Sequence, residues 1–156
     1  MTEIINFTKN KLQQKKIAAA VDLFLFSYRK ADFLVSVVLV GDRRMQSLNR
    51  KYRGQNKSTD VLSFRQEEYM GNILGEIFIN LQEAARVRKF QGLLEELKCK
   101  DINFRHTKDF IFYFLLTHGL LHLIGYNDDS PKERQLMLDL GKKFMHKLAG
   151  CGIIKL

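Results

Sequence analysis

The chain has 156 residues, of which 46% are hydrophobic and 28% are charged, and its formal net charge at pH 7 is +9. This length predicts one domain spanning residues 1–156, large enough to bury a core without help from disulfides. The two cysteines, Cys99 and Cys151, are too far apart for a zinc ribbon and too few for a disulfide framework, and the positive charge favours an anionic partner such as nucleic acid.

The first half of the chain is predicted to alternate between strands and helices. The expected elements are a strand over 4–7, a helix from a cap at Asn10 to about Tyr28, a strand over 33–40, and a helix over 43–52 capped by Asp42. Apolar residues recur near the helical period between Leu12 and Leu25, with the lysines mostly between them. Residues 33–40 are nearly all apolar, which predicts a strand covered on both faces.

The second half is predicted to begin with a polar turn and two short strands. The expected elements are a turn over 53–58, strands over 61–64 and 74–80, and a loop over 66–72 between the strands. They are followed by a helix over 81–98 with a possible break at 91–92, a polar loop over 100–108 that carries His106, and a helix over 109–124. Ser130, Pro131 and Glu133 then mark the start of a last helix that runs to about Lys147. Gly75, inside a strand, predicts a bulge or a close backbone approach.

The interleaved strands and helices predict an α+β fold, with about five helices packed on a single small mixed sheet of about four strands. No signal peptide is expected, because the N-terminus has no basic region followed by an apolar segment. The longest apolar run, 110–124, is too short to span a membrane. It is expected to be a core helix, in which Phe110, Phe112 and Phe114 are core side chains rather than a platform for stacking bases.

The most informative residues lie at the end of that helix, where His118 and His122 are four positions apart. Side chains at this spacing lie on one face of a helix, so two imidazoles can bind one metal ion. Gly125 can take the left-handed conformation that ends a helix, and the chain can then bring Asp128, or alternatively Asp129, to the same ion. Three protein ligands with one open position are typical of catalytic zinc sites, whereas a bare histidine pair is more often a packed or surface pair.

The same spacing occurs in the metzincin metallopeptidases, which place a glutamate directly after the first histidine as the general base. Gly119 stands at that position here. Because the chain lacks this carboxylate, the sequence argues against a peptidase.

This stretch resembles the YbeY family of metal-dependent endoribonucleases much more closely. Residues 118–126, His-Gly-Leu-Leu-His-Leu-Ile-Gly-Tyr, match the family's signature without a break. Residues 48–53 and 58–64 resemble a second block of the family, and residues 74–79 resemble a third, in which the family usually has Gly-Asp-Ile. The blocks stand in the family's order and cover most of the chain from about Phe33, while the N-terminal part fits only in its pattern of secondary structure.

The resemblance implies a metal-dependent, single-strand-specific endoribonuclease that acts in 16S rRNA 3′-end maturation and ribosome quality control. It implies one Zn²⁺ per chain, held by His118, His122 and Asp128 on a central helix and the turn after it. Arg53 occupies the position of an arginine that the family uses in its active site, and a guanidinium is suited to a phosphate. The expected partners are single-stranded RNA or rRNA and the ribosome or its proteins, in the cytoplasm and with no membrane association.

The sequence departs from the family at two places. Asp128 stands where the family has a third histidine, which lowers the net charge of the site and should acidify a metal-bound water less. The polar segment around 100–108 is an insert before the metal helix. Beside the metal residues, Asp60 and Ser63 could line the cleft, although Asp60 is better explained as a local cap or turn acceptor, and Tyr126 is expected to pack beneath the turn.

Two alternatives remain open at this point. The protein could be a catalytically weakened ribosome- or RNA-associated factor whose metal is structural or absent. In that case the replacement of the third histidine by Asp128 would accompany the loss of catalysis. It could also be another metal hydrolase that acts on small substrates, although that function leaves the positive charge unexplained.

Overall fold

The computed structural model describes residues 1–66, 71–97 and 107–156. Four strands, β1 (Thr2–Asn6), β2 (Leu34–Val40), β3 (Val61–Arg65) and β4 (Ile73–Asn80), form one sheet in the order β1-β2-β4-β3. β1, β2 and β4 are parallel, and β3 runs antiparallel to β4 at one edge. The sheet is therefore mixed and four-stranded, as predicted.

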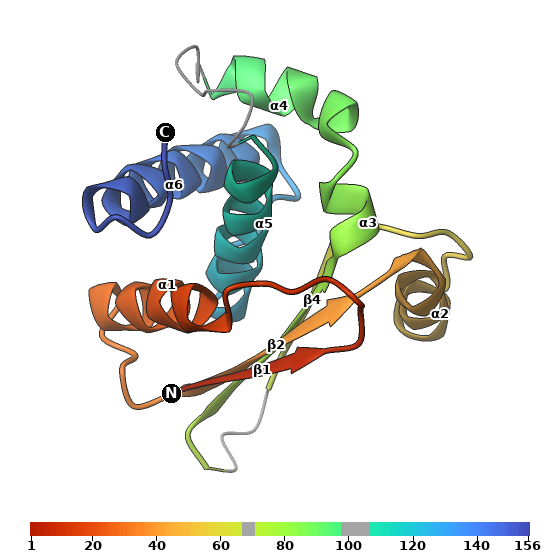
Figure 1. Ribbon diagram of the computed structural model, residues 1–156, viewed down its shortest axis with the longest axis horizontal. Coiled ribbons are helices and arrows are strands. Elements are labelled where there is room, and N and C mark those ends of the chain that lie inside the picture. Colours follow the sequence, from red (N-terminus) through yellow and green to blue (C-terminus); the bar gives the residue numbers. More distant parts are fainter. Residues whose placement is uncertain (67–70, 98–106) are drawn as a thin grey trace.

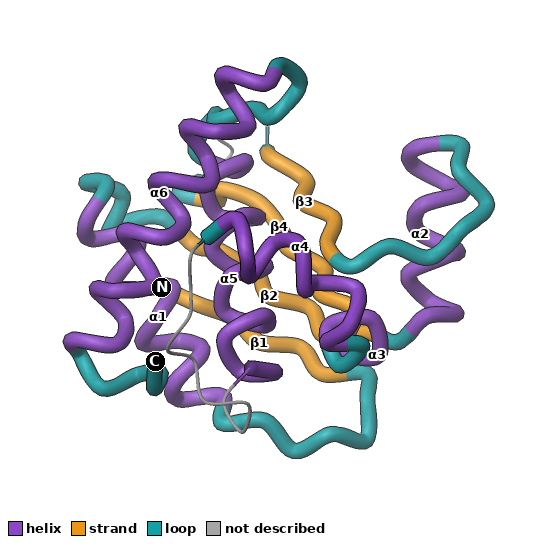
Figure 2. The backbone as a smooth tube through the Cα atoms, turned by 90° about the horizontal axis from the view of Figure 1, so that it is seen from above, coloured by secondary structure: helices purple, strands orange, loops and turns teal. Residues whose placement is uncertain are grey.

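Six α-helices and one 3₁₀ helix accompany the sheet in the described residues. They are α1 (Gln14–Ser27), α2 (Asp42–Arg53), α3 (Leu81–Ala84), η1 (Val87–Phe90), α4 (Gln91–Glu96), α5 (Thr107–Leu123) and α6 (Pro131–Gly150). α1, α5 and α6 lie together on one side of the sheet, while α2 lies apart from them (Figures 1 and 2). This arrangement confirms the predicted α+β fold.

The residues of β2 divide between the two faces of the sheet. Val35, Val37 and Leu39 belong to the main core with α1, α5 and α6, whereas Val38 and Val40 pack with Met45 of α2. This alternation follows from the two-residue period of a strand. All positions from Val35 to Val40 are buried, so the prediction of a strand covered on both faces is confirmed.

Gly75 produces an irregularity in β4. Leu34 pairs with Ile73, but the next residue, Val35, pairs with Gly75, so that one residue of β4 is extra. Gly75 has a φ of 150°, and a Cβ at this position would lie 2.2 Å from the carbonyl oxygen of Phe64 and 2.9 Å from Cδ2 of Leu123. The sequence predicted either a bulge or a close approach, and the structure contains both.

α5 occupies the centre of the molecule. Every residue from Phe110 to Thr117 is buried, including Phe110, Phe112 and Phe114. A helix that is apolar on all sides is one that other elements surround, and α5 packs against β3, β4, α1 and α6. The prediction of a core helix is confirmed. Among the described residues, no helix is long and apolar enough to cross a membrane.

Two helix predictions were wrong in detail. The first helix starts at Gln14 rather than after Asn10, because Asn6, Thr8 and Asn10 hydrogen-bond to one another and hold a turn there. The predicted helix over 81–98 is divided into α3, η1 and α4, with its first interruption at Arg86, where ψ is 65°.

The starts of α5 and α6 were predicted more accurately. Ser130 and Glu133 form a reciprocal capping box with Pro131 in the first turn, which fixes the start of α6 at the predicted residue. α5 begins at Thr107, two residues earlier than predicted. Most of the predicted loop over 100–108, including His106, and positions 67–70 of the predicted loop over 66–72 lie outside the described residues.

Candidate metal centre

The C-terminal end of α5 turns the chain back toward its own histidines. The backbone N–H of Gly125 donates to the carbonyl of His122 and that of Tyr126 donates to the carbonyl of Leu121, the hydrogen bonds of a Schellman motif. Gly125 takes a φ of 104°, a conformation that L side chains rarely adopt. The turn returns residues 126–128 to the face of α5 that carries His118 and His122.

Three side chains converge there. Nε2 of His122 lies 3.0 Å from Nε2 of His118, and the carboxylate oxygens of Asp128 lie 3.4 Å from Nε2 of His118 and 3.8 Å from Nε2 of His122. One ligand atom of each residue lies within 4.8 Å of the others. Asp129, the alternative third ligand, is exposed and does not belong to this group.

These separations fit one small metal ion. Zinc binds imidazole nitrogen and carboxylate oxygen at about 2.0–2.2 Å, and in a tetrahedral site two such ligand atoms are about 3.3 Å apart. The observed distances of 3.0, 3.4 and 3.8 Å lie around that value. Since the described residues supply three protein ligands, a tetrahedral ion held by these alone would keep one position for water or substrate.

A backbone carbonyl sets the orientation of His122. Nδ1 of His122 lies 2.9 Å from the carbonyl oxygen of Tyr126, and because a carbonyl can only accept, Nδ1 must carry the proton. In the neutral ring, Nε2 then has a free lone pair, and this is the atom that faces His118. Metal-binding histidines are usually held in this way by a second partner. The half-buried Tyr126 packs against the core, as predicted, and its backbone orients the ligand.

The surroundings also favour neutral His118. Burial lowers the pKa of His118 most, and the neighbouring His122 lowers it further, while the carboxylates of Asp128 and Asp60 act in the opposite direction. The pKa remains below its ordinary value of 6.5. Near neutral pH the imidazole is therefore unprotonated, which is the form that binds metal.

Gly119 is explained by packing rather than by chemistry. A Cβ on Gly119 would lie 2.8 Å from Cγ2 of Ile77, because this side of α5 is pressed against β4. A glutamate, as in the metallopeptidases, has no space here, and it would point at the sheet instead of at the histidines. The structure thus gives an independent reason to exclude the peptidase arrangement.

Asp60 and Arg134 are two charged residues that act on His118, and only Asp60 was singled out from the sequence. The sequence predicted Asp60 as a turn acceptor, and its Oδ1 indeed accepts from the backbone N–H of Val61 at 2.7 Å and from the hydroxyl of Thr59 at 3.3 Å. Its charge also acts on His118. Arg134, in the first turns of α6, acts on both His118 and Asp128 and is held by Glu96 through two hydrogen bonds of 2.8 and 2.9 Å. The sequence analysis missed Arg134, whose only signal is its place just after the capping box.

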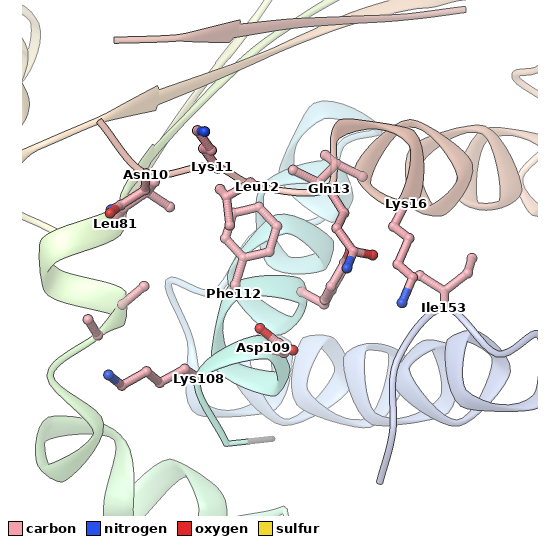
Figure 3. A pocket seen from close by; sticks show the side chains of 14 residues that line it. Asn10, Lys11, Leu12, Gln13, Lys16, Leu81, Lys108, Asp109, Phe112 and Ile153 are labelled. Atoms are coloured by element: carbon pink, nitrogen blue, oxygen red, sulfur yellow. The ribbon is translucent and has the colours of Figure 1, made fainter. Parts of the chain in front are cut away.

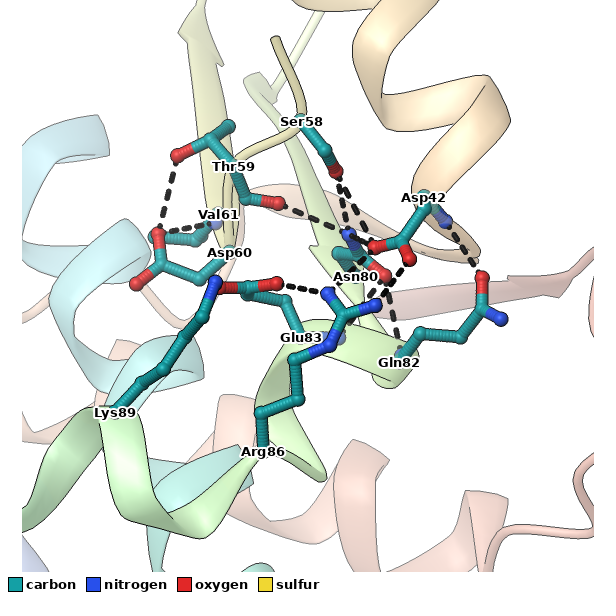
Figure 4. A network of polar contacts seen from close by, with 10 residues as sticks. All are labelled: Asp42, Ser58, Thr59, Asp60, Val61, Asn80, Gln82, Glu83, Arg86 and Lys89. Atoms are coloured by element: carbon teal, nitrogen blue, oxygen red, sulfur yellow. Dashed lines mark hydrogen bonds and ion pairs between the residues drawn. The ribbon is translucent and has the colours of Figure 1, made fainter.

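A buried asparagine holds the segment that leads to Asp60 (Figure 4). The side-chain amide of Asn80 donates to Oδ1 of Asp42 at 2.7 Å, to the hydroxyl of Ser58 at 2.9 Å and to the carbonyl of Thr59 at 3.1 Å. Its oxygen accepts from two backbone N–H groups of α3. Asn80 therefore joins the end of β4 to the loop before β3.

Asp42 has a different role from the predicted helix cap. It is the first residue of α2, and the N-cap position is occupied by Gly41. Asp42 instead receives hydrogen bonds of 3.1 and 2.6 Å from Arg86 as well as that from Asn80. The hydrogen bond from Arg86 is the main cause of the lowered pKa of Asp42.

Arg53 is not part of the convergent group. It is the last residue of α2, is exposed, and precedes Gly54, whose φ of 67° ends the helix. Within the described residues it makes no hydrogen bond or ion pair, and α2 packs on the opposite face of the sheet from α5. The structure therefore brings His118, His122 and Asp128 together, and it places Arg53 at the end of a helix on the other face of the sheet.

Comparison with known proteins agrees with this geometry. The family model described as "Endoribonuclease YbeY" matches residues 2–149. A protein of that name from Syntrophomonas wolfei is 32% identical, over 92% of this chain and 90% of its own length. Another, from Ehrlichia chaffeensis, is 33% identical, over 93% of this chain and 84% of its own length.

A solved structure extends the agreement to the fold. The solution structure of TM1509 from Thermotoga maritima superposes with a TM-score of 0.61 at 25% sequence identity, covering 96% of this chain and 90% of its own. The match of the family model covers nearly the whole chain, including the histidine pair and the turn after it. The chain therefore belongs to the YbeY endoribonuclease family.

Proposed function

We propose that this protein is a metal-dependent endoribonuclease that cleaves single-stranded RNA, with one zinc ion per chain bound by His118, His122 and Asp128. The observation that supports the proposal best is the convergence of these three side chains at distances that suit one ion. The name of the family, endoribonuclease, supplies the substrate class. The net charge of +9 suits a polyanionic substrate.

Each residue has a distinct part in the proposed reaction. His118 and His122 bind the ion through Nε2, and the carbonyl of Tyr126 keeps the proton of His122 on the other nitrogen. Asp128 is the third ligand and reduces the positive charge of the site. When bound, zinc polarises a phosphate oxygen or lowers the pKa of a water molecule.

The role of Arg53 is to bind the RNA strand rather than the ion. Its guanidinium is exposed at the end of α2, free of internal ion pairs in the described structure, and can donate two hydrogen bonds to a phosphate. Because it is an arginine at the position that the family uses in its active site, we assign it to a phosphate of the RNA substrate. Arg134 is closer to the metal ligands but is already engaged by Glu96.

We extend the proposal to the setting of the reaction. The substrate is ribosomal RNA, the step is maturation of the 3′ end of 16S rRNA together with ribosome quality control, and the partners are the ribosome or its proteins in the cytoplasm. These assignments follow the family resemblance and agree with the basic character of the chain.

One observation favours a second function. The carboxylate of Asp128 reduces the charge of the site in comparison with a third imidazole, so a bound water would be less acidic. Under this alternative the protein binds RNA or ribosomes, and its metal is structural or absent.

Cleavage of a single-stranded RNA with and without metal separates the two functions. Purified protein treated with a chelator should lose cleavage and regain it when zinc is added, while a double-stranded RNA of the same sequence should remain intact. Binding of the RNA without cleavage, at any zinc concentration, would support the binding factor and contradict the nuclease.

A further inference from the structure

A cavity lies on the far side of α5 from the histidines. It has a volume of about 330 Å³ and is formed by the segment before α1, the first turns of α1 and α5, and the end of α3 (Figure 3). Asp109, in its wall, and His118 are separated by about two and a half turns of α5, so they lie on opposite faces of that helix. The cavity is therefore separate from the candidate metal centre.

The charged residues of the cavity come from different parts of the chain. Lys11, Lys16, Lys108 and Asp109 line it, which gives a net charge of two positive. Lys16 and Lys108 lie on opposite sides, with Gln13 and Asp109 between them (Figure 3). In the part of the chain that the structure describes, none of the three lysines forms an ion pair with a carboxylate. The cavity thus has cationic groups available for an anion.

The remainder of the wall is apolar and aromatic. Leu12, Ile17, Leu81 and Phe112 form it, with the ring of Phe112 beside Leu12 (Figure 3). A cavity of this size is at the lower end of the range for small-molecule sites, which combine an apolar lining with a few polar groups. Its ligand should therefore have a flat or apolar body as well as a negative charge.

We propose that this cavity binds a nucleotide that carries a phosphate monoester. A phosphate monoester has a charge of about −1.5 to −2 at pH 7, which matches the charge of the cavity. The ammonium group of Lys16 binds the phosphate, Lys108 on the opposite side adds to the positive charge, and the base lies against Leu12. Gln13 and Asp109 offer hydrogen-bond acceptors to ribose hydroxyls or base amino groups. Inorganic phosphate has neither of these groups and cannot make such hydrogen bonds.

The test measures binding of adenosine 5′-monophosphate to the full-length protein by calorimetry, with adenosine and inorganic phosphate as separate probes. Saturable binding of one nucleotide per chain is expected, and each probe alone should bind about tenfold more weakly or worse. Lys16→Glu should reduce the affinity about tenfold or more. Lys15→Glu makes the same charge change at the next exposed residue of α1, outside the cavity, and should stay within about twofold.

His118→Ala separates this site from the proposed nuclease. Nucleotide binding should be unchanged in that variant even though its RNA cleavage is lost. The absence of saturable binding to the unmodified chain, an equal loss for Lys15→Glu and Lys16→Glu, or loss of binding in His118→Ala would each overturn the proposal. Circular dichroism of every variant, together with the milder Lys16→Gln, guards against misfolding.

A competition experiment identifies the source of the nucleotide. A short RNA with a 5′-phosphate that displaces adenosine 5′-monophosphate supports a site for the end of an RNA strand. If the same RNA does not displace adenosine 5′-monophosphate, the result supports a site for the free nucleotide. In both cases the cavity remains a phosphate-monoester site.

Discussion

Asp128 differs from the other two candidate ligands in being a carboxylate rather than an imidazole. Its carboxylate acts on His118 against the effects of burial and of His122, yet the pKa of His118 stays below its ordinary value. His118 therefore remains a neutral ligand beside the carboxylate. This combination binds zinc well but leaves less positive charge to activate water than three imidazoles would.

Arg53 can be tested against a neighbour in the same turn of α2. Arg53→Glu should lower kcat/KM for single-stranded RNA by about tenfold or more, because a phosphate contact becomes a repulsion. Arg50→Glu makes the same charge change at another exposed arginine of that turn and should have a smaller effect. Equal losses in the two variants would reduce Arg53 to a contributor to the general positive charge, and unchanged activity would remove it from the mechanism.

At the level of secondary-structure elements, the position of the histidines depends on how closely α5 approaches β4. Gly119 permits this approach, since its missing Cβ would meet Ile77. Ile77 is fully buried in the main core and has little space to move. The glycine that separates this chain from metallopeptidases thus also sets the distance between α5 and the sheet.

Gly119→Ala should lower the free energy of unfolding by about 1–2 kcal/mol, as overpacking of about 1–3 kcal/mol exceeds the gain of up to about 1 kcal/mol in helix propensity. Gly92→Ala is the matched control, because Gly92 lies in α4 with nothing within 4 Å of its Cβ position, and it should be neutral or stabilising. Urea denaturation of both variants measures the difference. A Gly119→Ala protein as stable as Gly92→Ala would show that α5 can move away from β4 at no cost.

The contacts between the start of α2, α3 and the segment from Arg86 through η1 should make stability depend on pH. The hydrogen bond from Arg86 is the largest cause of the lowered pKa of Asp42, with further lowering by Asn80 and Ser58. Burial raises the pKa of Glu83, but hydrogen bonds from Lys89 and Arg86 lower it by more. For such carboxylates the folded state binds protons less readily than the unfolded state, so their contribution is present above the ordinary pKa values, 3.8 and 4.5, and is lost as the pH falls through the lowered ones.

Replacing Arg86 by alanine should therefore weaken the acid dependence of stability. We expect the free energy of unfolding of metal-free protein to fall less steeply below about pH 4 in Arg86→Ala than in the unmodified chain. Arg88→Ala removes an exposed arginine of η1, two residues further along the chain, and should keep the original slope. If the two variants have the same slope, the ion pairs of Arg86 do not determine the pKa of Asp42.

At the scale of the whole molecule, the sequence predicted the fold class and most of the elements. Local signals were sufficient where the residues that determine an element are neighbours in the chain, as with Ser130 and Glu133 at the start of α6. The division of the helix predicted over 81–98 was not visible, because residues 81–91 contain neither proline nor glycine to mark it. Arg86 leaves the helical conformation where it reaches Asp42, a residue from a distant part of the chain.

In the candidate site, too, local features could be predicted from the sequence, while features that depend on tertiary packing could not. The spacing of His118, His122 and Asp128 was sufficient to predict that they meet, since one helix and one turn position them. The electrostatic effect of Arg134 on His118 and Asp128 could not be predicted, because it depends on how α6 packs beside α5 and on the ion pair with Glu96. The face of the sheet on which α2 packs was equally hidden, as it depends on contacts of Met45 with Val38 and Val40.

The metal content of two aspartate variants tests the central claim most directly. Purified unmodified protein should contain about one zinc per chain by elemental analysis, and so should Asp129→Asn, whose side chain lies outside the convergent group. Asp128→Asn should lose most of its zinc, because an amide oxygen is a much weaker ligand than a carboxylate. Full zinc occupancy in Asp128→Asn would contradict the proposed ligand set.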